Sequence, residues 1–114
     1  MSNSNLHSFV LYAPDYTDEG ALQRRLAVRG QHFATSHELR GKGVYGVAGG
    51  LLSDDGVGAV DPAQKLIGSM IIINAGSLEE ARKIAENDVY WTANVWDKER
   101  TTLVPFLMAK LSPS

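Results

Sequence analysis

The stretch LIGSMIIIN, residues 66–74, is the most strand-like segment of the chain and decides its fold class. Its second half, Met70–Ile73, is continuously apolar and does not alternate between apolar and polar residues. A run of this kind is typical of a strand that is buried on both faces. We therefore expect this strand to be covered on both sides, whether by helices or by a partner chain.

The residues that open the chain predict a strand and then a helix. Residues 9–13 are a short apolar run that ends at Pro14, as a buried strand does. A helical pattern follows to about residue 40, and Thr17 or Asp18 is expected to cap it. Gly30 lowers the stability of the middle of this helix by ~1 kcal/mol relative to alanine. The sequence is therefore compatible with a kink or a break at this residue.

Between this helix and residue 66, the sequence predicts a second strand and a loop. Residues 44–48 form the strand, which continues to residue 52. Turn-forming residues, among them Asp54, Gly56 and Pro62, fill residues 53–64, which we expect to be a long exposed hairpin loop.

The residues after the central strand predict a second helix and a last strand. Ser77 and Glu80 fit a capping box, so a helix is expected from residue 78 to about 87, with an inward stripe at Leu78, Ala81, Ile84 and Ala85. A short turn over residues 88–96 precedes a strand over 101–108, and Pro105 favours an edge position or a bulge for that strand.

The order of elements is β-α-β-β-α-β, which predicts an α+β fold of the ferredoxin-like type with a four-stranded antiparallel sheet. At 114 residues the chain is expected to be a single domain over residues 1–114, with residues 1–7 and 109–114 as loose tails.

Composition argues against several classes of function. The net charge of −2 gives no footprint for nucleic acid or an anionic membrane surface. The absence of cysteine excludes thiolate chemistry and cysteine-ligated metals, and no histidine or carboxylate cluster indicates a metal site. No G-x-G-x-x-G run supports a nucleotide, so no cofactor is expected. With neither a signal peptide nor an apolar stretch long enough to span a bilayer, the cytoplasm is the expected location.

His32 and Asp88 are the residues with the clearest chemical potential. His32 lies on the first predicted helix, and Asp88 follows the second. If the fold brings them together, the carboxylate would orient the imidazole for general acid–base work. The alternatives are a surface histidine and an aspartate that only caps a short helix, although one carboxylate is able to fill both roles.

Several other residues are candidates for contact with a substrate. Arg25, Arg29, His32 and Ser36 fall on one helical stripe, which would suit an anionic or phenolic compound if a cleft faces it, or would otherwise be a solvated face. The remaining candidate substrate contacts are Tyr12, Ser69, Tyr90 and Trp91. For Tyr12, Ser69 and Trp91 the alternative is a packing role in the core or at an interface.

Six motifs in order resemble the YCII-related (YciI-like) family of dimeric α/β-barrel proteins. They are FVLYAPD at 9–15, Arg29-x-x-His32, GGLL with the DDG turn at 49–56, Gly68-Ser69, SLEEA at 77–81 and DVY at 88–90. In that family a histidine and an aspartate form the active-site dyad, which the resemblance transfers to His32 and Asp88, with Arg29 as a substrate contact. The chain departs from the family pattern at Val89, where proline is usual.

The resemblance implies a homodimer in which two ferredoxin-like domains pair into a barrel. It also implies a cofactor-independent enzyme that isomerises, dehydrates or eliminates HX from a small cyclic or phenolic metabolite. The alternative is a non-catalytic dimeric protein that binds a small ligand or serves as an accessory protein of a pathway. In either case the expected partners are a second copy and a small molecule.

Overall fold

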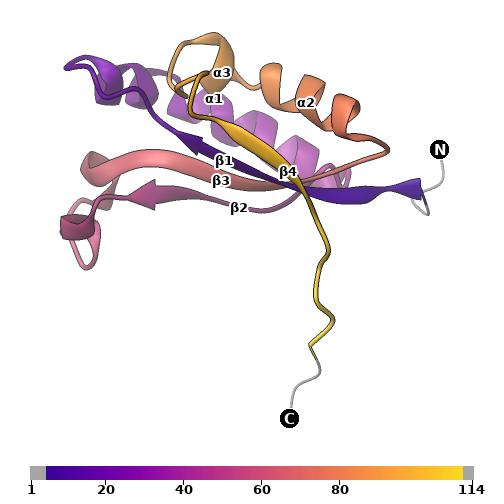
Figure 1. The fold of residues 1–114 in the computed structure, drawn as a ribbon. Helices are drawn as coiled ribbons and strands as arrows, with labels where there is room; N and C mark the ends of the chain where they lie inside the picture. Colours follow the sequence, from indigo (N-terminus) through magenta and orange to yellow (C-terminus); the bar gives the residue numbers. More distant parts are fainter. Residues whose placement is uncertain (1–4, 112–114) are drawn as a thin grey trace.

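The four strands form one antiparallel sheet in the order β2-β3-β1-β4, and the helices lie on one of its faces (Figure 1). The structure is a computed structural model that describes residues 5–111. The strands are β1 (His7–Pro14), β2 (Tyr45–Leu52), β3 (Leu66–Ala75) and β4 (Thr102–Phe106), and the helices are α1 (Ala21–Gly41), α2 (Leu78–Glu86) and α3 (Val89–Thr92). This arrangement confirms the predicted α+β, ferredoxin-like fold.

Strand β3 pairs with both β1 and β2 and supplies the centre of the core. Ile71 and Ile73 are fully buried beneath the helices, because alternate residues of a strand point to the same face. Met70 and Ile72 point to the other face, where Ile72 is paired with Val10 of β1. The predicted strand is confirmed, but no helix among residues 5–111 covers its second face (Figure 1).

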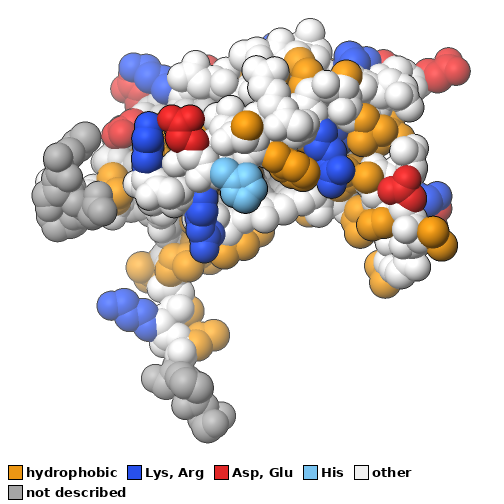
Figure 2. Space-filling model, turned by 180° about the vertical axis from the view of Figure 1, so that it is seen from behind, with side chains coloured by type: hydrophobic (Ala, Val, Ile, Leu, Met, Phe, Trp, Pro, Cys, Tyr) orange, Lys and Arg blue, Asp and Glu red, His pale blue; other side chains and the backbone are white. Residues whose placement is uncertain are grey.

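This second face, which we call the open face, is apolar. Cross-strand pairing places Val104 opposite Val10 and Phe106 opposite Ser8, so these side chains share a face with Met70 and Ile72. Val104 is 50% exposed and Phe106 42% exposed. Hydrophobic side chains form a row along the lower edge of Figure 2, where this face lies. Contiguous apolar side chains exposed on one face of a sheet often mark an interface.

Helix α1 differs from its prediction at its start. It begins at Ala21 after Gly20, and no side chain caps it. Asp18, one of the two predicted caps, instead accepts two hydrogen bonds from Arg24 and one from the backbone N–H of Gly20. The carboxylate therefore closes the turn before the helix. Gly30 does not interrupt α1, which continues unbroken to Gly41.

The ends of α2 and α3 follow the predicted capping chemistry. The Ser77 hydroxyl accepts the backbone N–H of Glu80, and Asp88 caps α3 by accepting the N–H of Tyr90. Leu78 is 37% exposed, so it does not belong to the inward stripe that was expected. Strand β4 is an edge strand that pairs with β1, which accommodates Pro105 as predicted.

The termini and the loop also refine the sequence-based expectations. His7 pairs with Ala75 as the first residue of β1, so the predicted loose tail over residues 1–7 is too long by this residue. Residues 1–4 and 112–114 lie outside the described part of the chain.

The loop after β2 contains two short 3-10 turns, Asp54–Gly56 and Pro62–Lys65. Among the described helices, none combines the length and hydrophobicity that a membrane span requires.

Candidate active site

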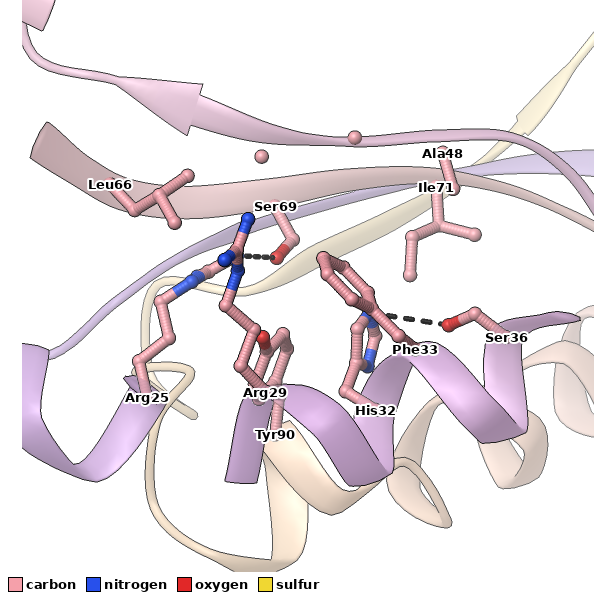
Figure 3. Close-up of a pocket in the computed structure, with 12 residues that line it drawn as sticks. Arg25, Arg29, His32, Phe33, Ser36, Ala48, Leu66, Ser69, Ile71 and Tyr90 are labelled. Atoms are coloured by element: carbon pink, nitrogen blue, oxygen red, sulfur yellow. Dashed lines mark hydrogen bonds between the residues drawn. The ribbon is translucent and has the colours of Figure 1, made fainter. Parts of the chain in front are cut away.

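One stripe of α1 faces a pocket of about 170 Å³ between that helix and strands β2 and β3. Figure 3 shows Arg25, Arg29, His32 and Ser36 rising from successive turns of α1 toward the strands. The stripe follows from spacings of three and four residues, which place side chains on one side of a helix. The strands contribute small residues, Ala48, Gly49, Gly50 and Ser69, so the pocket stays open. A cleft therefore faces the helical stripe, which is the condition on which the sequence predicted a substrate site.

His32 and Asp88 are in contact. The imidazole Nδ1 lies 2.8 Å from Asp88 Oδ1, and the two side chains are only 9% and 1% exposed. The same Oδ1 accepts the backbone N–H of Tyr90 at 2.9 Å. Asp88 thus caps α3 and meets the imidazole with one oxygen, which leaves Oδ2 for a third donor.

Tyr45 is that third donor, and sequence reasoning missed it. Its hydroxyl donates to Asp88 Oδ2 at 2.7 Å, and the side chain is fully buried. Burial, together with the charge of Asp88, raises the pKa of Tyr45 well above its usual value, so the phenol remains a neutral donor. In the sequence Tyr45 is only the inward residue of a strand, and no local pattern distinguishes it from a core tyrosine.

The other nitrogen of His32 faces the pocket. A carboxylate only accepts hydrogen bonds, so the contact with Asp88 places a proton on Nδ1, and in the neutral form of the ring Nε2 is then the acceptor. Ser36 Oγ lies 3.3 Å from Nε2, a long contact that a substrate hydroxyl is able to replace. The ring of Tyr90 stacks on the imidazole at a centroid distance of 3.9 Å, which fixes the plane of the ring.

Arg25 also lines the pocket, but its guanidinium is bound within the protein. Its Nη1 donates to both oxygens of Asp15, at 2.9 and 3.0 Å, and its Nη2 donates to Ser69 Oγ at 2.9 Å. The guanidinium also lies 4.5 Å from the ring centroid of Tyr90. Burial raises the pKa of Asp15, and the charge of Arg25 opposes that rise. The charge of Arg25 is therefore balanced within the protein.

Arg29 differs from Arg25 because it has no ion-pair partner among residues 5–111. Its guanidinium packs 4.7 Å from the ring centroid of Phe33, and the side chain is only partly buried. No acidic residue lines the pocket. Arg29 consequently supplies a positive charge that nothing in the pocket neutralises.

The structure brings together most of the candidate residues, but not all of them. Arg29, Ser69 and Tyr90 line the pocket beside His32. Tyr12 does not, because its neighbours Leu11 and Ala13 point to the core and Tyr12 therefore points to the open face, where it is 49% exposed.

Trp91 also lies away from the pocket. It follows Tyr90 on α3, and one residue along a helix turns the side chain by about 100°. Its ring instead packs with Lys98, whose Nζ lies 5.3 Å from the ring centroid. Trp91 therefore does not line the pocket beside His32. Within residues 5–111 no three His, Cys, Asp or Glu side chains cluster as a metal site would require.

The fold and the site together define a ferredoxin-like α+β domain with a buried histidine–aspartate pair beside a small, positively charged pocket. The chain belongs to the YCII-related domain family, whose sequence profile matches residues 8–106. The family resemblance seen in the sequence is thereby confirmed. None of the curated proteins matches the chain.

A solved structure is similar over almost the whole chain. It is the 5-chloro-2-hydroxyhydroquinone dehydrochlorinase TftG from Burkholderia phenoliruptrix AC1100, in complex with 2,5-dihydroxybenzoquinone. The two proteins are 25% identical, with a TM-score of 0.73, and the match covers 90% of this chain and 95% of that one. The chain is thus similar to an enzyme that acts on a small molecule.

Proposed function

We propose that the protein is a cofactor-independent enzyme that uses His32 and Asp88 for proton transfer on a small cyclic or phenolic compound. The observation that carries this proposal is the imidazole of His32, which Asp88 holds through Nδ1 while Nε2 has only a long contact with Ser36, a residue that lines the pocket. This arrangement suits a general base, because the nitrogen that accepts the proton is the one that a substrate reaches. The similarity to a dehydrochlorinase supports the same class of chemistry.

In the proposed reaction, His32 Nε2 takes a proton from a hydroxyl group or a ring carbon of the substrate. The electron pair left behind forms a new π bond, and either a leaving group departs with its own pair or the proton returns at another atom. Elimination, dehydration and isomerisation all fit this scheme. No electrons are exchanged with a second compound, so the scheme needs no redox cofactor.

Asp88 is proposed to act only through His32. It does not line the pocket, so it is a positioning residue that stabilises the imidazolium formed when Nε2 is protonated. Arg29 is proposed to bind an anionic or enolic oxygen of the substrate, because its charge is free and its planar fork suits oxygen acceptors.

The size of the pocket supports a compound with one ring. An apolar protein cavity of ~150 Å³ is large enough to bind benzene. The pocket here, at about 170 Å³, has room for one substituted six-membered ring against Phe33 and Ile71. Ser36 and Ser69 offer hydroxyl groups to its substituents.

We further propose that two copies pair through the open face. Tyr12, Val104 and Phe106 are each about half exposed there, and Leu107, Met108 and Leu111 extend the apolar surface beyond β4. A second copy would supply the cover that the apolar run Met70–Ile73 predicts. This homodimer agrees with the barrel that the family resemblance implies.

The test is turnover and binding of chlorinated and hydroxylated hydroquinones by the wild-type protein and by His32→Ala and Asp88→Asn. General acid–base groups contribute on the order of 10²–10⁴-fold to rate, so His32→Ala should lose at least about a hundredfold while still binding the ring. His7→Ala, which removes an exposed histidine of β1, is the control and should leave turnover unchanged. Turnover that survives in both site variants would overturn the proposal. Binding without turnover of any such compound would favour the ligand-binding protein instead.

A further inference from the structure

The pocket at His32 does not end at Ser36. A second hollow of about 200 Å³ adjoins it and shares three lining residues with it, Phe33, Ser36 and Ala48. In Figure 3, Ser36 lies at the end of the pocket away from Arg25, and Phe33 lies between them beside His32. The two hollows are therefore neighbouring parts of one groove between α1 and β2.

The second hollow has its own cation. Arg40 lines it, and Nη1 of this residue donates to the backbone carbonyl of Gly46 at 2.7 Å. That bond holds the guanidinium across the groove from α1 to β2. Its other N–H donors have no partner within residues 5–111, so they are available to a ligand.

No acidic side chain opposes this cation within the groove. Within the described residues 5–111, no aspartate or glutamate lines either hollow, although the chain has 13 such residues and a net charge of −2. Glu38, two residues before Arg40, does not line the groove and pairs with Lys42 at 3.1 Å. On the side of the molecule that carries α1, basic side chains flank a histidine side chain (Figure 2). The groove thus presents one uncompensated guanidinium at each hollow, Arg29 in the first and Arg40 in the second.

We propose that the second hollow binds a carboxylate carried on a short chain by the substrate whose ring lies at His32. A planar carboxylate matches the fork of donors on the guanidinium of Arg40, and His37 lines the same hollow as a second basic side chain. Ser36, shared by the two hollows, lies where such a chain would leave the ring. The position of the ring rests on the proposed function, whereas the role of Arg40 does not depend on turnover.

The experiment compares three probes by calorimetry: hydroquinone, its carboxyethyl derivative and the amide of that derivative. The carboxylate probe should bind about fivefold more tightly than the amide, as an ion pair at a partly exposed site allows. Arg40→Gln should remove this difference and leave the affinity for hydroquinone unchanged. Lys42→Gln removes a positive charge from the same end of α1 outside the groove, and it should preserve the difference.

The outcomes separate the subsite from the proposed function. Equal affinities for carboxylate and amide, with hydroquinone still bound, would overturn the subsite and leave the ring site standing. A preference for the carboxylate that persists in Arg40→Gln would also overturn it. If hydroquinone fails to bind while Arg40 still discriminates carboxylate from amide, the subsite stands and the proposed ring site fails.

Discussion

At Asp88 three donors converge on one buried carboxylate: the Tyr45 hydroxyl, the imidazole of His32 and the backbone N–H of Tyr90. Two of them share Oδ1, and one of these two is a backbone group that does not move away. An asparagine at this position would therefore be expected to keep its side-chain oxygen on the side that faces Tyr90 N–H and His32. Asparagine would thus keep the hydrogen bond that orients the imidazole and remove the negative charge that stabilises the imidazolium.

The first prediction concerns this substitution, Asp88→Asn. We expect the amide oxygen to keep facing Tyr90 N–H and His32, so neutral His32 should still carry its proton on Nδ1. Turnover should nevertheless fall by about tenfold or more, because the charge that stabilises the imidazolium is gone. ¹⁵N NMR of the imidazole reports the tautomer. A spectrum of the variant with the proton on Nε2 would contradict this account.

The second prediction concerns Tyr45 at alkaline pH. Burial, together with the charge of Asp88, raises the pKa of Tyr45, so above pH ~10 the unfolded chain releases a proton that the folded chain keeps. Fewer protons on the unfolded state make the free energy of unfolding fall as pH rises through this range. Urea unfolding of Tyr45→Phe between pH 8 and pH 11 should therefore show a smaller loss than the wild type.

The reference for this experiment is the wild-type protein, unfolded in urea over the same range of pH. At neutral pH, Tyr45→Phe should itself be less stable by about 1–3 kcal/mol, because a buried oxygen of Asp88 loses its donor. An alkaline loss equal to that of the wild type would show that Tyr45 titrates normally.

At the scale of elements, the glycine in the interior of α1 lowers the stability of that helix. Gly30 lies in the helix interior, is exposed, and a Cβ added there would meet nothing within 4 Å. Gly30→Ala should therefore raise the free energy of unfolding by about 1 kcal/mol, which for a domain of this size is a rise in Tm of several degrees. Thermal denaturation followed by circular dichroism measures it.

Gly43 provides the opposite case for comparison. A Cβ there would also meet nothing within 4 Å, but its φ is +75°, a conformation that side chains disfavour. Gly43→Ala should lower stability by about 1 kcal/mol. If Gly30→Ala and Gly43→Ala both shifted Tm in the same direction, the backbone conformation of the two glycines would not explain the changes in stability.

The backbone at Asp88 and at the start of α3 follows from local conformational preferences. Asp88 has a ψ of 140°, the extended backbone that a residue before proline adopts, and Val89 occupies the first position of α3, where proline is favoured. Val89 therefore occupies a position that proline would also suit. The cap bond from Tyr90 holds the turn in place of the restricted ring.

For the whole molecule, the open face leads to the fourth prediction. The wild-type protein should be a dimer at micromolar concentration by light scattering, and Val104→Lys should weaken the dimer by at least about tenfold, since each copy would bring a charge into an apolar interface. Val57→Lys places the same charge on a loop residue that is 85% exposed, and it should not alter association. A monomeric wild-type protein would contradict the proposed pairing.

The sequence by itself determined the order of the elements, most of their boundaries and the family. Each of these is recorded locally, in the apolar run of β3, in the capping chemistry of Ser77 and Asp88, and in motifs of a few residues. It also placed Arg29, His32 and Ser36 on one stripe, because a helix fixes that relation within a single segment.

Only the tertiary structure decided which of these side chains meet. It joined His32 to Asp88, brought Tyr45 to the second oxygen of that carboxylate, and turned Tyr12 and Trp91 away from the pocket. It also balanced the charge of Arg25 with Asp15, and left Arg29 and Arg40 along the groove without an ion-pair partner among residues 5–111. The physical reason is that these contacts join residues from different elements, so they depend on how strands and helices pack, whereas periodicity and caps depend only on neighbours along the chain.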